Sequence, residues 1–239
     1  MRMHDLKLPD GVDAYFFHNP DEAGKALAGA VAEHLAERLL VAPRASLAVS
    51  GGSTPLPFFE ALRDKPLDWA RLDVLLADER WVPEEDEDSN TRLVKANLLQ
   101  GAAAQARYLS LKQPGETPMA GLGAVKAALE QLALPLDALV LGMGTDGHTA
   151  SLFPDAPELD QALDAESGQI VSPMTPASQS RKRISLTLGA LKQAGFTALH
   201  LKGDDKLEAL QAACSDIETI RDMPVRAFLK PGLKIYWSG

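Results

Sequence analysis

The sequence predicts an α/β fold in which an open, mostly parallel sheet carries helices on both faces. Short apolar segments alternate along the chain with longer segments of helical periodicity, an order typical of parallel sheets. Several apolar segments end in polar or glycine-rich turns, at Ser50, Asp78, Gly142 and Gly203. Ligands bind beyond the carboxyl ends of the strands in such sheets. The sequence therefore also predicts a binding site along this edge.

The individual elements can be assigned in chain order. Asn19, Pro20 and Glu22 form the pattern that starts a helix, and we expect this helix to run to about Leu40. Its apolar stripe consists of Ala23, Leu27, Val31 and Leu35. Further helices are expected at 56–62, with Ser53 or Thr54 as the cap, at 89–99, from 117 to about 132, and after 206. Strands are expected at 14–17, 46–50, 71–77, around 108, and at 136–141, 170–171, 183–188, 196–201 and 234–237.

Length and composition are those of a globular protein with one core. The chain has 239 residues, of which 46% are hydrophobic and 24% are charged. It contains no internal repeat and no low-complexity linker. We therefore expect residues 1–239 to form a single Rossmann-like α/β domain, with room for a smaller lobe built from inserted segments.

Several classes of protein are excluded or disfavoured by the same data. A net charge of -9 argues against nucleic-acid binding, which requires a basic face. No run approaches the roughly 18 apolar residues of a membrane span, and residues 1–10 lack the apolar core of a signal peptide. The one cysteine, Cys214, permits no intrachain disulfide and suggests a reducing compartment. We expect a cytoplasmic protein, either a monomer or a small homo-oligomer.

The turn after the second strand is a candidate phosphate-binding loop. It comprises Ser50, Gly51, Gly52, Ser53 and Thr54. The glycines leave backbone N–H groups accessible, the hydroxyls add donors, and the helix that follows contributes a partial positive charge. The loop lacks the Gly-Lys-Ser/Thr ending of a Walker motif. Taken alone, the pattern fits a capped tight turn equally well.

The segment from Gly142 to Pro154 is a candidate catalytic loop. It places Asp146 and His148 among glycines that include Gly144 and Gly147. An imidazole is partly neutral at physiological pH, so His148 can serve as a general base. Either Asp146 or Asp78 could accept the proton on its other ring nitrogen, and the spacing does not choose between them.

Other interpretations of this loop are weaker. Gly142, Gly144 and Gly147 also match the dinucleotide-binding pattern, which should open a full helix in the first βαβ unit. Here the pattern lies past the middle of the chain, and Pro154 interrupts any helix within two turns. A metal site is not expected, because no second histidine or thiolate has ligand spacing and His200 fits a core position.

Basic side chains on the same edge could complete an anion site. The candidates are Arg80, Lys206 and one of the adjacent residues Arg181, Lys182 and Arg183, among which the spacing does not choose. We interpret the acidic run at 84–88 as a solvated loop.

Taken together, these segments resemble the 6-phosphogluconolactonase family. The matching segments are Ser50-Gly-Gly-Ser-Thr-Pro55, Asp78-Glu-Arg-Trp-Val-Pro83 with Asp88-Ser-Asn90, the loop 142–154, Arg183-Ile-Ser-Leu186 and Gly203-Asp-Asp-Lys206. Ser185 departs from the threonine more often found there, which leaves Arg183 in place. The resemblance implies hydrolysis of 6-phospho-D-glucono-1,5-lactone to 6-phosphogluconate, a step of the oxidative pentose phosphate pathway, without a metal or organic cofactor.

The resemblance also implies roles for the residues. His148 would activate the attacking water and Asp146 would support it. The loop from Ser50 to Thr54 and the residues Arg80, Arg183 and Lys206 would hold the phosphate or the sugar acid. For the oxyanion that water attack creates, we expect donors among the N–H groups near Gly144 or Gly147 or among the arginines.

Two alternative functions remain. Amino-sugar-phosphate deaminases and isomerases are similar in the first three segments, but their pattern continues after the histidine with Ala-Phe-Asn-Glu. This chain has Ala150-Ser-Leu-Phe-Pro154 there and lacks the acid. A non-catalytic sugar-phosphate sensor is the other alternative, for which neither end of the chain offers a DNA-binding segment.

Overall fold

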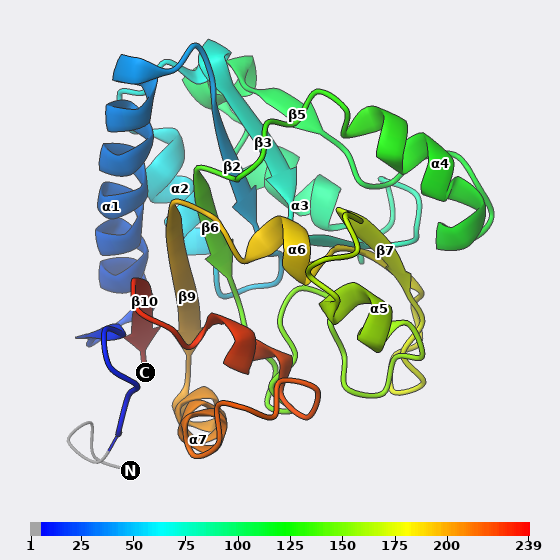
Figure 1. Cartoon of the computed structure of the whole chain (residues 1–239). Helices are drawn as coiled ribbons and strands as arrows, with labels where there is room; N and C mark the ends of the chain where they lie inside the picture. The colour runs from blue at the N-terminus through cyan, green and yellow to red at the C-terminus, as the bar shows by residue number, and fades with distance from the viewer. Residues whose placement is uncertain (1–5) are drawn as a thin grey trace.

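The computed structural model describes residues 6–239 and places a parallel sheet at the centre of the fold (Figure 1). Within these residues seven strands pair in the order β1-β10-β9-β6-β2-β3-β5, and every neighbouring pair is parallel. The strands are β1 (Asp13–Phe17), β2 (Ala45–Val49), β3 (Leu72–Leu76), β5 (Arg107–Leu109), β6 (Ala138–Leu141), β9 (Phe196–Lys202) and β10 (Leu233–Ser238). The predicted fold class is confirmed.

The connections explain how helices come to cover both faces of this sheet. The chain crosses the sheet in one direction from β1 through β2 and β3 to β5, and it returns through β6 and β9 to β10. Right-handed crossovers place the helices of the two halves on opposite faces (Figure 1). The helices are α1 (Pro20–Val41), α2 (Leu56–Arg63), α3 (Asn90–Asn97), α4 (Pro118–Ala128), α5 (Leu159–Leu163), α6 (Leu188–Leu191) and α7 (Asp204–Cys214).

Helix α1 forms for the reasons that its sequence indicates. The Asn19 side chain accepts a hydrogen bond of 2.9 Å from the Glu22 N–H, and Pro20 occupies the first turn. The predicted stripe, Ala23, Leu27, Val31 and Leu35, is fully buried. At α2 the predicted cap is wrong. Pro55 occupies the cap position without a side-chain hydrogen bond, so the hydroxyls of Ser53 and Thr54 stay free of that role.

The structure contains a second sheet, which the sequence did not predict. The strands β4 (Asp78–Arg80), β8 (Arg183–Leu186) and β7 (Val171–Met174) form an antiparallel sheet in that order. The segments near 170 and 183 are indeed strands that pair with each other, but β8 also pairs with β4, about a hundred positions away, and such distant pairing leaves no local signal. The Leu186 N–H donates to the Ala77 carbonyl at 2.8 Å, which joins the two sheets where β3 leads into β4.

The order of strands reverses between β2 and β6, which are parallel neighbours. The loop after β2 leads to α2 on one face of the sheet, and the loop after β6 leads to the opposite face. The two loops therefore diverge and leave a crevice at this point, as expected for a parallel sheet. Among residues 6–239 the structure contains no helix long and apolar enough to cross a membrane.

Candidate active site

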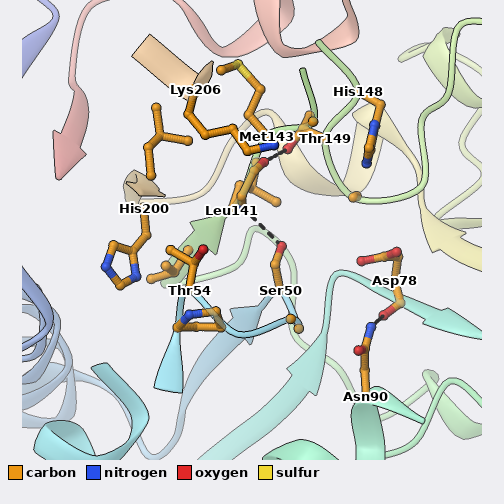
Figure 2. Close-up of a pocket in the computed structure, with 18 of the residues that line it drawn as sticks. Ser50, Thr54, Asp78, Asn90, Leu141, Met143, His148, Thr149, His200 and Lys206 are labelled. Atoms are coloured by element: carbon orange, nitrogen blue, oxygen red, sulfur yellow. Dashed lines mark hydrogen bonds between the residues drawn. The ribbon is translucent and has the colours of Figure 1, made fainter. Parts of the chain in front are cut away.

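A cavity lies in this crevice, beyond the carboxyl ends of β2 and β6. Both sheets and both loops line it, and Figure 2 shows the side chains around it. The predicted residues that line it are Ser50, Gly51, Gly52, Thr54, Asp78, Arg80, Gly144, His148, Arg183 and Lys206. The predicted residues Ser53, Asp146 and Gly147 do not line it directly. Side chains that are far apart in the sequence thus converge on one cavity.

His148 and Asp146 form a hydrogen-bonded pair beside the cavity. Nδ1 of His148 lies 2.6 Å from Oδ1 of Asp146, which also accepts the His148 backbone N–H at 3.1 Å. When Nδ1 carries the proton that Asp146 accepts, Nε2 holds a free lone pair. Burial raises the pKa of Asp146, but the hydrogen bonds and charge of His148 outweigh it, and the net pKa is lowered. Asp146 therefore remains an ionised partner for the imidazole.

Two neighbours fix the position of this pair. The Phe153 ring stacks on the His148 ring with a centroid separation of 4.0 Å and an interplanar angle of 21°. A side chain on Gly144 would collide with His148 and with Asp146 Oδ1, so only glycine leaves room for the pair. Gly147 has a φ of 79°, and a Cβ there would meet Met223. The lack of space at Gly144 and the backbone conformation at Gly147 thus explain why the loop has glycine at these two positions.

Asp78 does not orient His148. Its Oδ2 accepts a hydrogen bond of 2.5 Å from the Ser151 hydroxyl and lies 3.8 Å from Nη1 of Arg183. The alternative left open by the sequence is thus decided by geometry, and Asp146 is the partner of the imidazole. Asp78 instead supplies the one carboxylate that lines the cavity within the described residues.

Arg183 is the member of the basic triplet that faces the cavity. It is 8% exposed, donates to Gln179 Oε1 at 2.9 Å, and its guanidinium lies 5.0 Å from the Phe153 ring centroid. Burial lowers its pKa. Arg181 instead binds Asp88 Oδ2 at 2.8 Å on the surface. The acidic run at 84–88 is mostly exposed, as expected, although this ion pair anchors its end.

The cavity concentrates positive charge although the protein is acidic. Arg80, Arg183, Lys202 and Lys206 line it, against the single carboxylate of Asp78. Within the described residues, Nε of Arg80 and Nε of Arg183 are buried and have no hydrogen-bond partner. Buried donors of charged groups are costly to leave unpaired. The cavity is therefore suited to an anionic ligand.

The loop after β2 contributes backbone donors to the same cavity. Within residues 6–239 the N–H groups from Gly51 to Thr54 make no hydrogen bond, and they precede the start of α2. Gly52 has a φ of 92°, a conformation that favours glycine. The Ser50 hydroxyl accepts the Gly142 N–H at 3.3 Å and ties this loop to the catalytic loop (Figure 2). The arrangement has the free amides that an anion-binding loop needs.

The glycine amides proposed as oxyanion donors are occupied. The Gly144 N–H donates to the His148 carbonyl at 2.9 Å, and the Gly147 N–H donates to the Gly144 carbonyl at 3.0 Å. Both bonds close the turn that presents His148. Arg80 and Arg183 line the cavity, and the Nε of each has no hydrogen-bond partner in the described residues, so the arginines remain candidate donors.

Sequence reasoning missed several residues that line the cavity. Asn90 occupies the space that a Gly51 side chain would need, and its Nδ2 donates weakly to the Asp78 carbonyl at 3.5 Å (Figure 2). The segment Asp88-Ser-Asn90 in the family resemblance was the signal that could have identified it. Lys202 ends β9 next to the predicted Lys206. Met143 and Thr149 also contribute to the wall.

His200 is buried on β9 at 4% exposure, as the sequence predicted, but it also lines the cavity, which the sequence did not predict (Figure 2). Burial lowers its pKa from 6.5 to about 4, so the folded protein keeps it neutral where the unfolded chain is protonated. The unfolded state binds more protons between these values, and stability should therefore fall as the pH drops from about 6.5 to about 4. The full loss is roughly 3 kcal/mol.

This pH dependence can be measured by urea unfolding at several pH values. His200→Gln should make the loss of stability at low pH smaller, because it removes the titrating group. His18→Gln, at an exposed position, should leave this loss unchanged. An equal slope in wild type and His200→Gln would show that another group causes the decline.

Among residues 6–239 no group of three His, Cys, Asp or Glu side chains is arranged to hold a metal ion. The glycines at 142, 144 and 147 open no helix, and the next helix, α5, begins only at Leu159. The dinucleotide pattern in this loop therefore lacks the helix that binds a pyrophosphate.

Comparisons with known proteins agree with this geometry. A family model described as glucosamine-6-phosphate isomerases/6-phosphogluconolactonase matches residues 18–237. The chain is 45% identical over 237 residues to a 6-phosphogluconolactonase of Pseudomonas aeruginosa, with 99% of each chain covered. It is 43% identical over 228 residues to one of Rhizobium meliloti, covering 94% of this chain and 97% of the relative. A crystal structure of a 6-phosphogluconolactonase from Shewanella baltica OS155 matches with a TM-score of 0.92 and 36% identity, covering 98% of this chain and 100% of that chain.

Proposed function

This chain belongs to the family of glucosamine-6-phosphate isomerases and 6-phosphogluconolactonases, and we propose that it hydrolyses 6-phospho-D-glucono-1,5-lactone to 6-phosphogluconate in the oxidative pentose phosphate pathway. The observation that carries this proposal is the His148–Asp146 pair, which stands beside a cavity rich in cations and free backbone amides. An imidazole base next to an anion-binding loop is what hydrolysis of a phosphorylated lactone requires.

His148 acts as the general base in this mechanism. Its Nε2 takes a proton from a water molecule as the water oxygen attacks C1 of the lactone. The ring C1–O5 bond then breaks, and the protonated imidazole returns the proton to O5. The products are a carboxylate, the C5 hydroxyl and one released proton. Asp146 holds the ring through Nδ1 and stabilises the imidazolium that forms transiently.

The remaining residues hold the substrate. The free amides from Gly51 to Thr54 and the ammonium of Lys206 bind the 6-phosphate, and the hydroxyls of Ser50, Ser53 and Thr54 assist them. Arg80 and Arg183, with their unpaired Nε donors, bind the lactone carbonyl oxygen and the sugar acid. Preorganised donors of this kind stabilise the oxyanion that water attack creates. Asp78 keeps Arg183 in place.

The segment after the histidine supports hydrolysis over deamination or isomerisation. The rival chemistry needs a carboxylate there to move protons on the sugar carbons. This chain has Ser151, whose hydroxyl bonds Asp78, and Phe153, whose ring stacks on His148. A non-catalytic sensor is less well supported, because it would have no use for a His–Asp pair with a free Nε2.

We also propose that the two sheets act as one domain, since both contribute walls of the cavity. We further propose that the protein works as a monomer or a small homo-oligomer. The single cysteine supports work in a reducing compartment such as the cytoplasm.

A lactone-hydrolysis assay tests the proposal. Enzyme is added to 6-phospho-D-glucono-1,5-lactone and to unphosphorylated glucono-1,5-lactone, and each rate is corrected for spontaneous hydrolysis. We expect kcat/KM to be at least about 100-fold higher for the phosphorylated substrate, because a charge-assisted phosphate contact contributes about 1.5–3 kcal/mol and several act together. Formation of fructose 6-phosphate from glucosamine 6-phosphate, without lactone hydrolysis, would instead identify a deaminase.

A further inference from the structure

Glu79 is a buried carboxylate that the proposed mechanism does not use. It follows Asp78 on β4, and its side chain is fully buried, with 0% exposure. Oε1 accepts the N–H groups of Arg80 and Asn90, each at 2.8 Å, and Oε2 accepts the N–H of Thr91 at 2.7 Å. A buried carboxylate is costly unless it is fully hydrogen-bonded, so this placement calls for an explanation.

The three bonds connect two parts of the cavity wall. Arg80 lies on β4 of the antiparallel sheet, and Asn90 is the first residue of α3. Both line the cavity, and the same Glu79 oxygen bonds the backbone of each. The same oxygen atom thus holds the backbones of these two residues close together.

Asn90 carries the connection on to the phosphate-binding loop. Its side chain fills the space beside the Gly51 Cα, where a Cβ would collide with it. Its Nδ2 lies 3.5 Å from the Asp78 carbonyl oxygen. A shift of Asn90 would therefore alter the contact with Gly51 and the path of the free amides that follow.

The charge of Glu79 matters for this arrangement. The N–H groups of Asn90 and Thr91 lie in the first turn of α3 and have no partner within the helix, and a negative charge is stabilised at this end of a helix. A glutamine of the same size would present an NH₂ group toward at least one backbone N–H, so one of the three bonds would be lost. Burial raises the pKa of the Glu79 carboxyl above its usual value, although the hydrogen bonds from Arg80, Asn90 and Thr91 oppose this effect.

We propose that Glu79 is a positioning residue, which fixes Arg80 and Asn90 against Gly51 and so sets the affinity of the site for its phosphorylated substrate. The inference rests on the proposed function for the identity of the substrate. It assigns Glu79 no contact with the substrate. The His148–Asp146 pair belongs to the other loop, after β6, and Glu79 makes no hydrogen bond to it in the described residues.

The test separates substrate binding from chemistry. Glu79→Gln should raise KM for the phosphorylated lactone about 10-fold, the loss expected for one misplaced hydrogen bond to a charged group, and should change kcat less than about 2-fold. The pH dependence of kcat should stay that of wild type. A purely structural role would instead lower the active fraction, and thus the apparent kcat, at constant KM. That result would overturn the proposal.

Two further measurements keep the proposal testable. Asp137→Asn is the matched control, because Asp137 also accepts a backbone N–H, from Ser46 at 2.8 Å, but at the opposite end of the strands. It should reduce stability and leave KM unchanged.

In an Asn90→Ala background, Glu79→Gln should raise KM by much less than it does alone, and full additivity would contradict action through Asn90. If Glu79→Gln does not fold, Glu79→Asp is measured in the same way, because the shorter aspartate side chain also cannot make all three hydrogen bonds.

Binding of 6-phosphogluconate distinguishes failure of this inference from failure of the proposed function. Calorimetry should find it bound about 10-fold more weakly by Glu79→Gln than by wild type. Wild type that binds 6-phosphogluconate but does not hydrolyse the lactone would refute the proposed function alone. Equal binding by both proteins would refute the role of Glu79.

Discussion

Replacing His148 by alanine should lower kcat for lactone hydrolysis by roughly 10²–10⁴-fold, the usual contribution of a positioned general base. The ring supplies the only imidazole of the catalytic loop, and its Nδ1 is held by Asp146 at 2.6 Å. Binding of 6-phosphogluconate should persist, because the amides after Ser50 and the cations of the cavity are untouched. Steady-state kinetics, corrected for spontaneous hydrolysis, and calorimetry measure the two quantities.

Two variants sharpen this prediction. Asp146→Asn should also lower kcat, because an amide at this position can donate to Nδ1 and favour the wrong tautomer. His18→Ala, at an exposed position before α1, should have wild-type kinetics. Turnover like that of wild type in His148→Ala would remove His148 as the base, whatever the result at Asp146.

Replacing Arg183 by alanine should lower kcat/KM for lactone hydrolysis by roughly 10- to 100-fold, because a charge-assisted hydrogen bond to the lactone oxygen contributes about 1.5–3 kcal/mol. The side chain is 8% exposed and its Nε has no partner among the described residues, so a bound anion can use it fully. Initial rates over a wide range of lactone concentration measure KM and kcat together.

The neighbouring Arg181 offers the matched control for this variant. It is two residues away in sequence and pairs with Asp88 on the surface, so Arg181→Ala should leave kcat/KM unchanged. Arg183→Lys should fall between wild type and Arg183→Ala, because lysine keeps the charge but lacks the planar fork. An unchanged kcat/KM in Arg183→Ala would assign the lactone carbonyl oxygen and the sugar acid to the other cations of the cavity.

Much of the fold could be predicted from local sequence patterns. The start of α1 could be predicted because an asparagine cap, a first-turn proline and an apolar stripe all act within one helix. The parallel strands could be predicted from short apolar runs that lie between helices. The cap of α2 could not be predicted, because Pro55 takes the cap position in the structure and the hydroxyls before it remain unbonded to the helix.

The site was predicted where one strand and its loop contain the signal. The loop 142–154 and the loop 50–55 each combine glycines with polar groups, and the carboxyl edge of a parallel sheet brings them together. The antiparallel sheet was missed, because β4 and β8 pair over a sequence separation that no window detects. Asn90 was missed for the same reason, since its contact with Gly51 joins residues of two different elements.

The sequence by itself determined the fold class, the two loops that carry the chemistry and the family to which the chain belongs, because these depend on residue types at short, fixed spacings. Only the tertiary structure decided that Asp146 and not Asp78 pairs with His148, that Arg183 and not Arg181 faces the cavity, and that the amides of Gly144 and Gly147 are already bonded. Only the tertiary structure shows that Glu79 bonds the backbone of Asn90. Each of these depends on the direction of a side chain or a backbone N–H in space, which is fixed by packing between elements distant in the chain.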